Sequence, residues 1–321
     1  MITVKDLSKR YGNKYALDKI SFEIGTGEIV GLLGPNGAGK STTMNIITGY
    51  LSYTEGKVEI NGLDILDYPN EAKKQIGYLP ENPPLYQEMT VKDYLNFVYD
   101  LKGCTFNRKK HLNEICEVVK LSDVYGRIIG HLSKGYKQRV GIAQALVGDP
   151  KVMIFDEPTS GLDPRQVVEM RNLIRTLGLN HTVIMSTHIL SEVQAVCDRT
   201  IIINKGKIAA DRKTEEIADV ASGNKRLSVK ICGPQKEVVS AIKALGGVVS
   251  VEPVGHGDID STSYIIESQQ SIDVRKALFN LLAKNNWALI GMESVGASLE
   301  DIFLALTERQ DQSRSSRRKV R

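Results

Sequence analysis

The feature that most constrains this chain is a glycine-rich segment near the N-terminus, Gly34-Pro35-Asn36-Gly37-Ala38-Gly39-Lys40-Ser41. It fills every fixed position of the pattern G-x-x-x-x-G-K-[ST], between an apolar strand-like run at residues 28–33 and a helix-like run at residues 41–48. The glycines allow backbone N–H groups to surround an anion, and the following helix directs its positive dipole end to the same point. We therefore predict a nucleoside triphosphate site, in which Lys40 contacts the β and γ phosphates and the Ser41 hydroxyl binds Mg²⁺.

Two adjacent carboxylates form the second candidate feature. The apolar run at residues 152–155 leads directly to Asp156 and Glu157. Adjacent carboxylates at the end of a buried strand are costly unless a cation is present, and Mg²⁺ beside the phosphates would supply that cation. We predict that Asp156 holds the metal, directly or through water, and that Glu157 polarises an attacking water. The alternative is an acidic strand end that faces solvent.

The order of apolar patterns predicts two domains, as expected for 321 residues. Strand-like runs at residues 28–33, 151–155 and 182–185 alternate with helix-like runs such as 164–177, which indicates an α/β fold with a largely parallel core sheet over residues 1–220. A helical subdomain is expected at about residues 83–148, with helices at 91–101 and 108–119.

A smaller α+β domain is expected over residues 221–308. Its runs follow the order β-α-β-β-α-β, typical of a ferredoxin-like domain, at residues 226–232, 236–245, 247–254, 263–267, 274–284 and 288–293. The sequence pattern at residues 298–306 then predicts a final helix, capped by Ser298.

Charge and cysteine content limit the classes of protein. Residues 310–321 contain five basic residues and one acid, a charge of +4 that equals the net charge of the whole chain, so the remainder is neutral overall. We expect no specific nucleic-acid partner, and a disordered basic tail at residues 309–321 with at most weak attraction to an anionic membrane.

The four cysteines form no C-x-x-C pair and are expected to be free thiols in a reducing cytoplasm. No apolar run approaches a membrane span, and charged residues interrupt the N-terminus before a signal-peptide core.

A third motif completes a family pattern. Leu132-Ser133-Lys134-Gly135-Tyr136-Lys137-Gln138-Arg139 precedes the two carboxylates, and with them the chain resembles the nucleotide-binding subunits of ATP-binding-cassette (ABC) transporters over residues 1–215. Ser133 and Gly135 match the family signature L-S-G-G-Q, whereas Lys134 and Tyr136 depart from it. Ser133 can cap a helix that starts near Lys134, so this is a second helix N-terminus directed at an anion.

The resemblance implies a role for each matching residue. Tyr11 occupies the position of the aromatic residue that stacks on adenine, and His188, after the strand at 182–186, that of the switch histidine. Glu157 is then the general base, His188 positions the γ-phosphate and water, and Lys40 spreads the developing charge. The residues implied to bind ATP are Tyr11, Gly34, Pro35, Asn36, Gly37, Ala38, Gly39, Lys40, Ser41, Thr42, Ser133 and Gly135.

One departure falls where the family has a glutamine that touches Mg²⁺ and the attacking water. After Ile76-Gly77-Tyr78-Leu79-Pro80 this chain has Glu81. A carboxylate can ligate Mg²⁺ but cannot donate a hydrogen bond while ionised, so the water's orientation can differ. Gln87 is an alternative occupant, in poorer register. The implied metal ligands are Ser41, Asp156 and Glu81.

The resemblance implies an ATPase at the cytoplasmic face of the cell membrane that powers separate permease subunits. A second ATP-binding subunit, identical or different, would close ATP between two protomers. The lysine in the signature, Glu81 and the segment 298–307 resemble the branch that serves bacterial export or multidrug-efflux permeases. A soluble cassette ATPase without a transport role and a nucleotide-sensing regulator are the alternatives.

Overall fold

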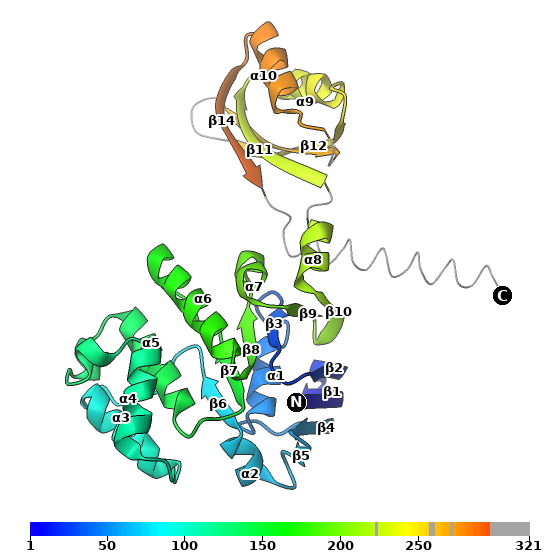
Figure 1. The fold of residues 1–321 in the computed structure, drawn as a ribbon. Helices are drawn as coiled ribbons and strands as arrows, with labels where there is room; N and C mark the ends of the chain where they lie inside the picture. Colours follow the sequence, from blue (N-terminus) through cyan, green and yellow to red (C-terminus); the bar gives the residue numbers. More distant parts are fainter. Residues whose placement is uncertain (222–223, 257–260, 270–271, 296–321) are drawn as a thin grey trace, which may run out of the picture. The chain divides into compact units, whose positions relative to one another are not determined.

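The computed structural model describes residues 1–221, 224–256, 261–269 and 272–295 (Figure 1). The chain divides into two units, Met1–Glu215 and Glu216–Arg321, and each has its own hydrophobic core. The division falls inside helix α8 (Thr214–Ala221), as does the predicted boundary at 220/221. The predicted helix at 298–306 and the predicted tail at 309–321 lie outside the described residues.

The first unit contains a six-stranded sheet in the order β10-β9-β3-β8-β7-β6. Its first five strands in sequence run parallel, and β10 pairs antiparallel with β9, which confirms the predicted parallel core. Strands β3, β7 and β8 are buried along their whole length, as expected for parallel strands covered on both faces. The strands are β3 (Ile29–Leu33), β6 (Ile76–Leu79), β7 (Val152–Asp156), β8 (Thr182–Thr187), β9 (Arg199–Asn204) and β10 (Lys207–Lys213).

A second sheet in this unit is antiparallel, in the order β2-β1-β4-β5. It consists of β1 (Ile2–Tyr11), β2 (Lys14–Ile24), β4 (Glu55–Ile60) and β5 (Leu63–Asp64). The sequence patterns did not predict this sheet. The register of β1 against β2 shifts three times, and Asp6 has a φ of 46°, so no regular alternation runs through the strand.

Helices of the first unit begin where the sequence supplies capping residues. Thr90 accepts a hydrogen bond from the Asp93 N–H at the start of α3, and Asp163 accepts one from Gln166 at the start of α6, where Pro164 is the first helical residue. Figure 1 shows α3, α4 and α5 gathered as a helical group beside the sheet, as predicted for the inserted helices. The helices are α1 (Lys40–Ile47), α2 (Pro69–Lys74), α3 (Val91–Leu101), α4 (Arg108–Val118), α5 (Lys134–Leu146), α6 (Pro164–Gly178) and α7 (Leu190–Val196).

The second unit follows the predicted order β-α-β-β-α-β. Its four strands form an antiparallel sheet in the order β12-β13-β11-β14, and both helices contribute to one core with the sheet, around the fully buried Tyr264. The elements are β11 (Asn224–Cys232), α9 (Gln235–Lys243), β12 (Val248–His256), β13 (Thr262–Gln269), α10 (Arg275–Lys284) and β14 (Ala288–Val295).

None of the helices in the described residues is long and apolar enough to cross a membrane.

Candidate nucleotide-binding site

The glycine-rich loop joins β3 to α1 at the carboxyl end of the parallel sheet. Gly37 and Gly39 have φ angles of 77° and 115°, in the left-handed region that favours glycine. A side chain at Gly39 would also bring its Cβ within 2.7 Å of Leu17, and one at Gly34 would lie 2.2 Å from the carbonyl oxygen of Ile203. The fixed glycines of the motif are therefore required by backbone conformation and by close packing.

Lys40 is buried above this loop. Its ammonium donates hydrogen bonds to the carbonyl oxygens of Gly34 and Pro35 at 2.7 and 3.3 Å, and lies 3.5 Å from Oε1 of Glu157. The loop thus holds a cation at its centre, where a phosphate group would bring negative charge.

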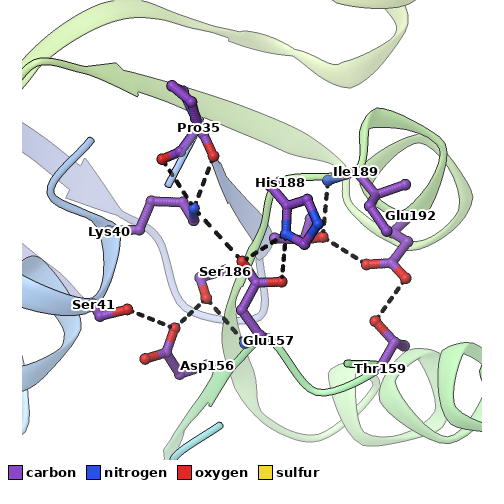
Figure 2. Close-up of polar contacts among 12 residues, drawn as sticks. Pro35, Lys40, Ser41, Asp156, Glu157, Thr159, Ser186, His188, Ile189 and Glu192 are labelled. Carbon is purple, nitrogen blue, oxygen red and sulfur yellow. Dashed lines mark hydrogen bonds and ion pairs between the residues drawn. The ribbon is translucent and has the colours of Figure 1, made fainter. Parts of the chain in front are cut away.

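Asp156 and Glu157 are held by a buried serine at the end of the neighbouring strand (Figure 2). The Ser186 hydroxyl donates to Oδ1 of Asp156 and accepts a 3.0 Å hydrogen bond from the Glu157 N–H. The Ser41 hydroxyl also donates to Oδ1 of Asp156, at 3.3 Å. Strand β8 and helix α1 therefore fix the position of Asp156 from two sides.

The Glu157 carboxylate lies between two nitrogen groups. Nδ1 of His188 is 3.0 Å from Oε2 and 3.2 Å from Oε1, and the Lys40 ammonium approaches Oε1. The residue is buried, with a φ of 47°, a conformation that a non-glycine residue adopts at a cost of about 1–3 kcal/mol and that the surrounding contacts must maintain. His188 is about half exposed, with 48% of its side chain accessible, so it forms the outer edge of the group.

Lys40, Glu157 and His188 line one cavity of about 470 Å³. Six of the nine residues from 34 to 42 line it, together with Glu81, Glu157 and His188. Ser160, in the loop after Glu157, also lines the cavity, as does Ala16 of β2, which was not recognised in the sequence. The side-chain amide of Gln87 instead donates to the carbonyl oxygen of Leu85, and Gln87 does not line the cavity.

A groove of about 920 Å³ adjoins the cavity and shares Ser41 and Glu81 with it. Asp156 and Tyr78 also line this groove, and the Tyr78 hydroxyl donates to Asn45 at 3.1 Å. Burial, and to a lesser extent the Asp156 carboxylate, raise the pKa of Tyr78 well above its ordinary value. Tyr78 therefore stays a neutral donor at the edge of the site.

Besides Gly34, Pro35 and Ala38 of the loop, three predicted nucleotide contacts from other parts of the chain do not line the cavity. Tyr11 is exposed at the end of β1, with the Lys9 ammonium 5.3 Å from its ring centroid. Ser133 and Gly135 lie at the start of α5, where the Tyr136 N–H donates to the Ser133 hydroxyl at 3.4 Å, so Ser133 is the predicted helix cap. None of these residues lines the cavity of its own chain.

Three residues that line the adjoining groove carry oxygen ligands of the kind that Mg²⁺ prefers. Ser41, Asp156 and Glu81 offer one hydroxyl and two carboxylates. In the part of the chain that the structure describes, no cluster of three or more His, Cys, Asp or Glu side chains forms a complete metal site. Mg²⁺ in nucleotide sites is usually bound through one or two carboxylates together with the phosphates of the nucleotide.

Four further residues beside the site were not recognised in the sequence. Ser186 holds Asp156 and Glu157, while Glu192 joins Thr159 to Thr187. Nothing in their local sequence distinguishes them, because their partners lie on another strand or loop.

Comparison with known proteins agrees with this geometry. The family model for ABC transporters matches residues 17–160, from β2 to the loop after Glu157. The ABC transporter ATP-binding protein YxlF of Bacillus subtilis is 38% identical over 307 residues, covering 95% of this chain and 98% of YxlF. The chain belongs to the ABC transporter ATP-binding proteins. As an ABC ATP-binding protein it is an ATPase and a transporter subunit.

Two further relatives extend the comparison. The linearmycin resistance ATP-binding protein LnrL of Bacillus subtilis is 31% identical over 319 residues, covering 96% of this ABC protein and 99% of LnrL. The dimeric structure of MJ0796, a bacterial ABC transporter cassette, has a TM-score of 0.61 at 29% identity and covers 67% of this chain and 99% of that cassette. The cassette fold predicted from the sequence is confirmed.

Proposed function

We propose that this ABC ATPase drives export of a substrate from the cytoplasmic face of the cell membrane, through separate permease subunits. The observation that carries the proposal is the cavity in which Lys40, Glu157 and His188 meet above the phosphate loop. LnrL, which aligns along almost the whole chain, is named for resistance to linearmycin, and this supports the outward direction.

Binding of ATP would use the cation already present in the loop. The Lys40 ammonium donates to two backbone carbonyls, and the β and γ phosphates offer it stronger, charged acceptors. The backbone N–H groups of residues 36–39 and of the first turn of α1 would bind the remaining phosphate oxygens. Tyr11 would offer its ring to the adenine base, and its exposed position leaves the face accessible.

Mg²⁺ would be held by Ser41 and Asp156, with Glu81 as a further oxygen ligand. The ion would neutralise charge on the β and γ phosphates. Asp156 already accepts hydrogen bonds from the hydroxyls of Ser41 in α1 and Ser186 in β8, which hold its carboxylate in place.

Hydrolysis is proposed to proceed by in-line attack of water on the γ-phosphate. Glu157 accepts the proton of that water, which typically contributes about 10² to 10⁴ in rate. His188 orients the Glu157 carboxylate and, on the open side of the cavity, the γ-phosphate. Lys40 stabilises the charge that develops on the phosphate oxygens.

A second ATP-binding subunit would complete the site. Ser133 and Gly135 lie outside the cavity of their own chain, as expected if the N-terminus of α5 contacts nucleotide bound to a partner. Shifting an open/closed equilibrium from 1:99 to 99:1 needs about 5.5 kcal/mol of differential binding. Charge-assisted hydrogen bonds contribute about 1.5–3 kcal/mol each, so two to four contacts to the γ-phosphate suffice, and hydrolysis removes them.

The test is co-purification from detergent-solubilised membranes of the cells that produce the protein. We expect a membrane protein with several spans to accompany the tagged chain. A chain shortened by residues 310–321 is the matched control, because it removes any simple attraction between the basic tail and lipid. Recovery of the chain without any membrane protein would favour a soluble, non-transport ATPase, and absence of steady-state ATP hydrolysis would favour a nucleotide-sensing regulator.

A further inference from the structure

Glu192 is a buried carboxylate that the proposed mechanism does not use. It lies in the first turn of α7 and is 3% exposed. Its Oε1 accepts a 2.6 Å hydrogen bond from the Thr159 hydroxyl, and its Oε2 accepts one of 2.6 Å from the Thr187 hydroxyl. Burial of a carboxylate is costly unless its oxygens are hydrogen-bonded, and both oxygens are (Figure 2).

The two threonines lie next to the proposed catalytic residues. Thr159 follows Glu157 by two residues, in the loop between β7 and α6, and Thr187 ends β8 directly before His188. The Thr187 hydroxyl also accepts a 3.1 Å hydrogen bond from the Ile189 N–H on the other side of His188. Glu192 therefore ties the segment that follows Glu157 to the segment that contains His188.

The link through Glu192 complements the one through Ser186. Ser186 joins the ends of β7 and β8 before Glu157, and Glu192 joins the two chain segments after it. None of Thr159, Thr187 and Glu192 lines the cavity. The three side chains can therefore act on the reaction only through the backbone that holds Glu157 and His188.

We propose that Glu192 is a positioning residue for ATP hydrolysis, which holds the Glu157 carboxylate and the His188 imidazole in register through Thr159 and Thr187. This rests on the proposed roles of Glu157 and His188. Catalytic groups must keep their productive geometry to within about 0.5 Å, and a misplacement of about 1 Å can cost as much as 100-fold in rate. A carboxylate with one oxygen for each threonine can fix both segments at once.

Thr159→Val tests this with the least disturbance, because valine has nearly the same shape and lacks only the hydroxyl. We expect kcat for ATP to fall roughly tenfold while KM changes less than about twofold, since the phosphate loop keeps its contacts. Thr159→Ser retains the hydroxyl and should restore most of the lost kcat. Glu192→Gln should act like Thr159→Val, because the amide nitrogen cannot accept a hydrogen bond.

Amide hydrogen exchange supplies a readout that does not depend on hydrolysis. In Thr159→Val and Glu192→Gln, the Ile189 amide should exchange faster, while amides of β3 keep their wild-type protection. An unchanged kcat in both variants, an equal loss in Thr159→Ser and Thr159→Val, or an unchanged Ile189 amide would each overturn the proposal. If the wild-type chain itself hydrolyses no ATP, the proposed function fails, and the exchange measurement still decides whether Glu192 links the two segments.

Discussion

Ser186→Ala removes the hydroxyl that joins the two strands of the catalytic group. In the wild-type protein this buried hydroxyl accepts the Glu157 N–H at 3.0 Å and donates to the Asp156 carboxylate. The substitution leaves a buried N–H without its acceptor, at a cost of about 1–3 kcal/mol, and removes a hydrogen bond to a charged group, which contributes about 1.5–3 kcal/mol. Because the two effects overlap, we expect the free energy of unfolding to fall by about 2–4 kcal/mol.

The chain contains its own control for this experiment. The Ser21 hydroxyl accepts the Asp6 N–H at 2.8 Å and donates to the Asp6 carboxylate at 3.3 Å, and Asp6 also has a positive φ, of 46°. The pair is exposed, so water can replace the hydroxyl, and we expect Ser21→Ala to change stability by no more than about 0.5 kcal/mol. The difference between the two variants therefore measures the effect of burial on the same pair of hydrogen bonds.

Thermal unfolding followed by circular dichroism measures both variants in nucleotide-free, Mg²⁺-free buffer. For a unit of this size, 2–4 kcal/mol corresponds to a decrease in Tm of roughly 5–15 °C. Trp287, the single tryptophan of the chain, lies in the second unit, so its fluorescence should report a transition that Ser186→Ala leaves in place. If Ser186→Ala is no more destabilising than Ser21→Ala, the hydroxyl does not hold Asp156 and Glu157 as described.

Three further predictions concern single side chains. Lys40→Met should weaken ATP binding by about 100-fold or more, because two charge-assisted contacts to the phosphates are lost. As a control, Lys73→Met in the adjoining groove should bind ATP within about twofold of the wild-type protein. Calorimetry that finds less than a threefold loss of affinity for Lys40→Met would contradict the role of Lys40. Tyr264→Phe should stabilise the second unit by about 1 kcal/mol, because the buried Tyr264 hydroxyl has no hydrogen-bond partner among the described residues. The Tm of the unfolding transition followed by Trp287 fluorescence should therefore rise. A lower Tm would show that the hydroxyl has a partner. Burial raises the pKa of Cys116 to about 11. At pH 9 only about 1% of this thiol is therefore thiolate, whereas about half of an exposed thiol is. Alkylation of Cys116 in the native protein should be roughly 50-fold slower than that of a free thiol. Alkylation of Cys116 at the rate of a free thiol would show that burial does not protect it.

Sequence predicted the parts of the fold that depend on local chemistry. The phosphate loop, the buried parallel strands and the helix cap at Ser133 are each specified by a few consecutive residues. The antiparallel sheet was not predicted, because the register shifts in β1 interrupt the alternation by which a strand is recognised.

The parts of the site that were missed depend on contacts between distant segments. Ser186 is 29 residues from the Glu157 N–H that it accepts, and Glu192 is 33 residues from Thr159. Charged residues of a short surface helix are usually exposed, so nothing in the sequence of α7 indicates that Glu192 is buried. Glu81 lines the cavity, as its position after β6 suggested, but its role in place of the family's glutamine stays a prediction.

The most direct test of the catalytic mechanism is the behaviour of Glu157→Gln with ATP and Mg²⁺. Glutamine keeps the shape of Glu157 but cannot accept the proton of the attacking water, so ATP binding should persist while turnover falls by about 10² or more. Closed dimers with ATP trapped between them should then accumulate, visible by size-exclusion chromatography and absent when ADP replaces ATP. Near-normal hydrolysis by Glu157→Gln would contradict the assignment of Glu157 as the general base.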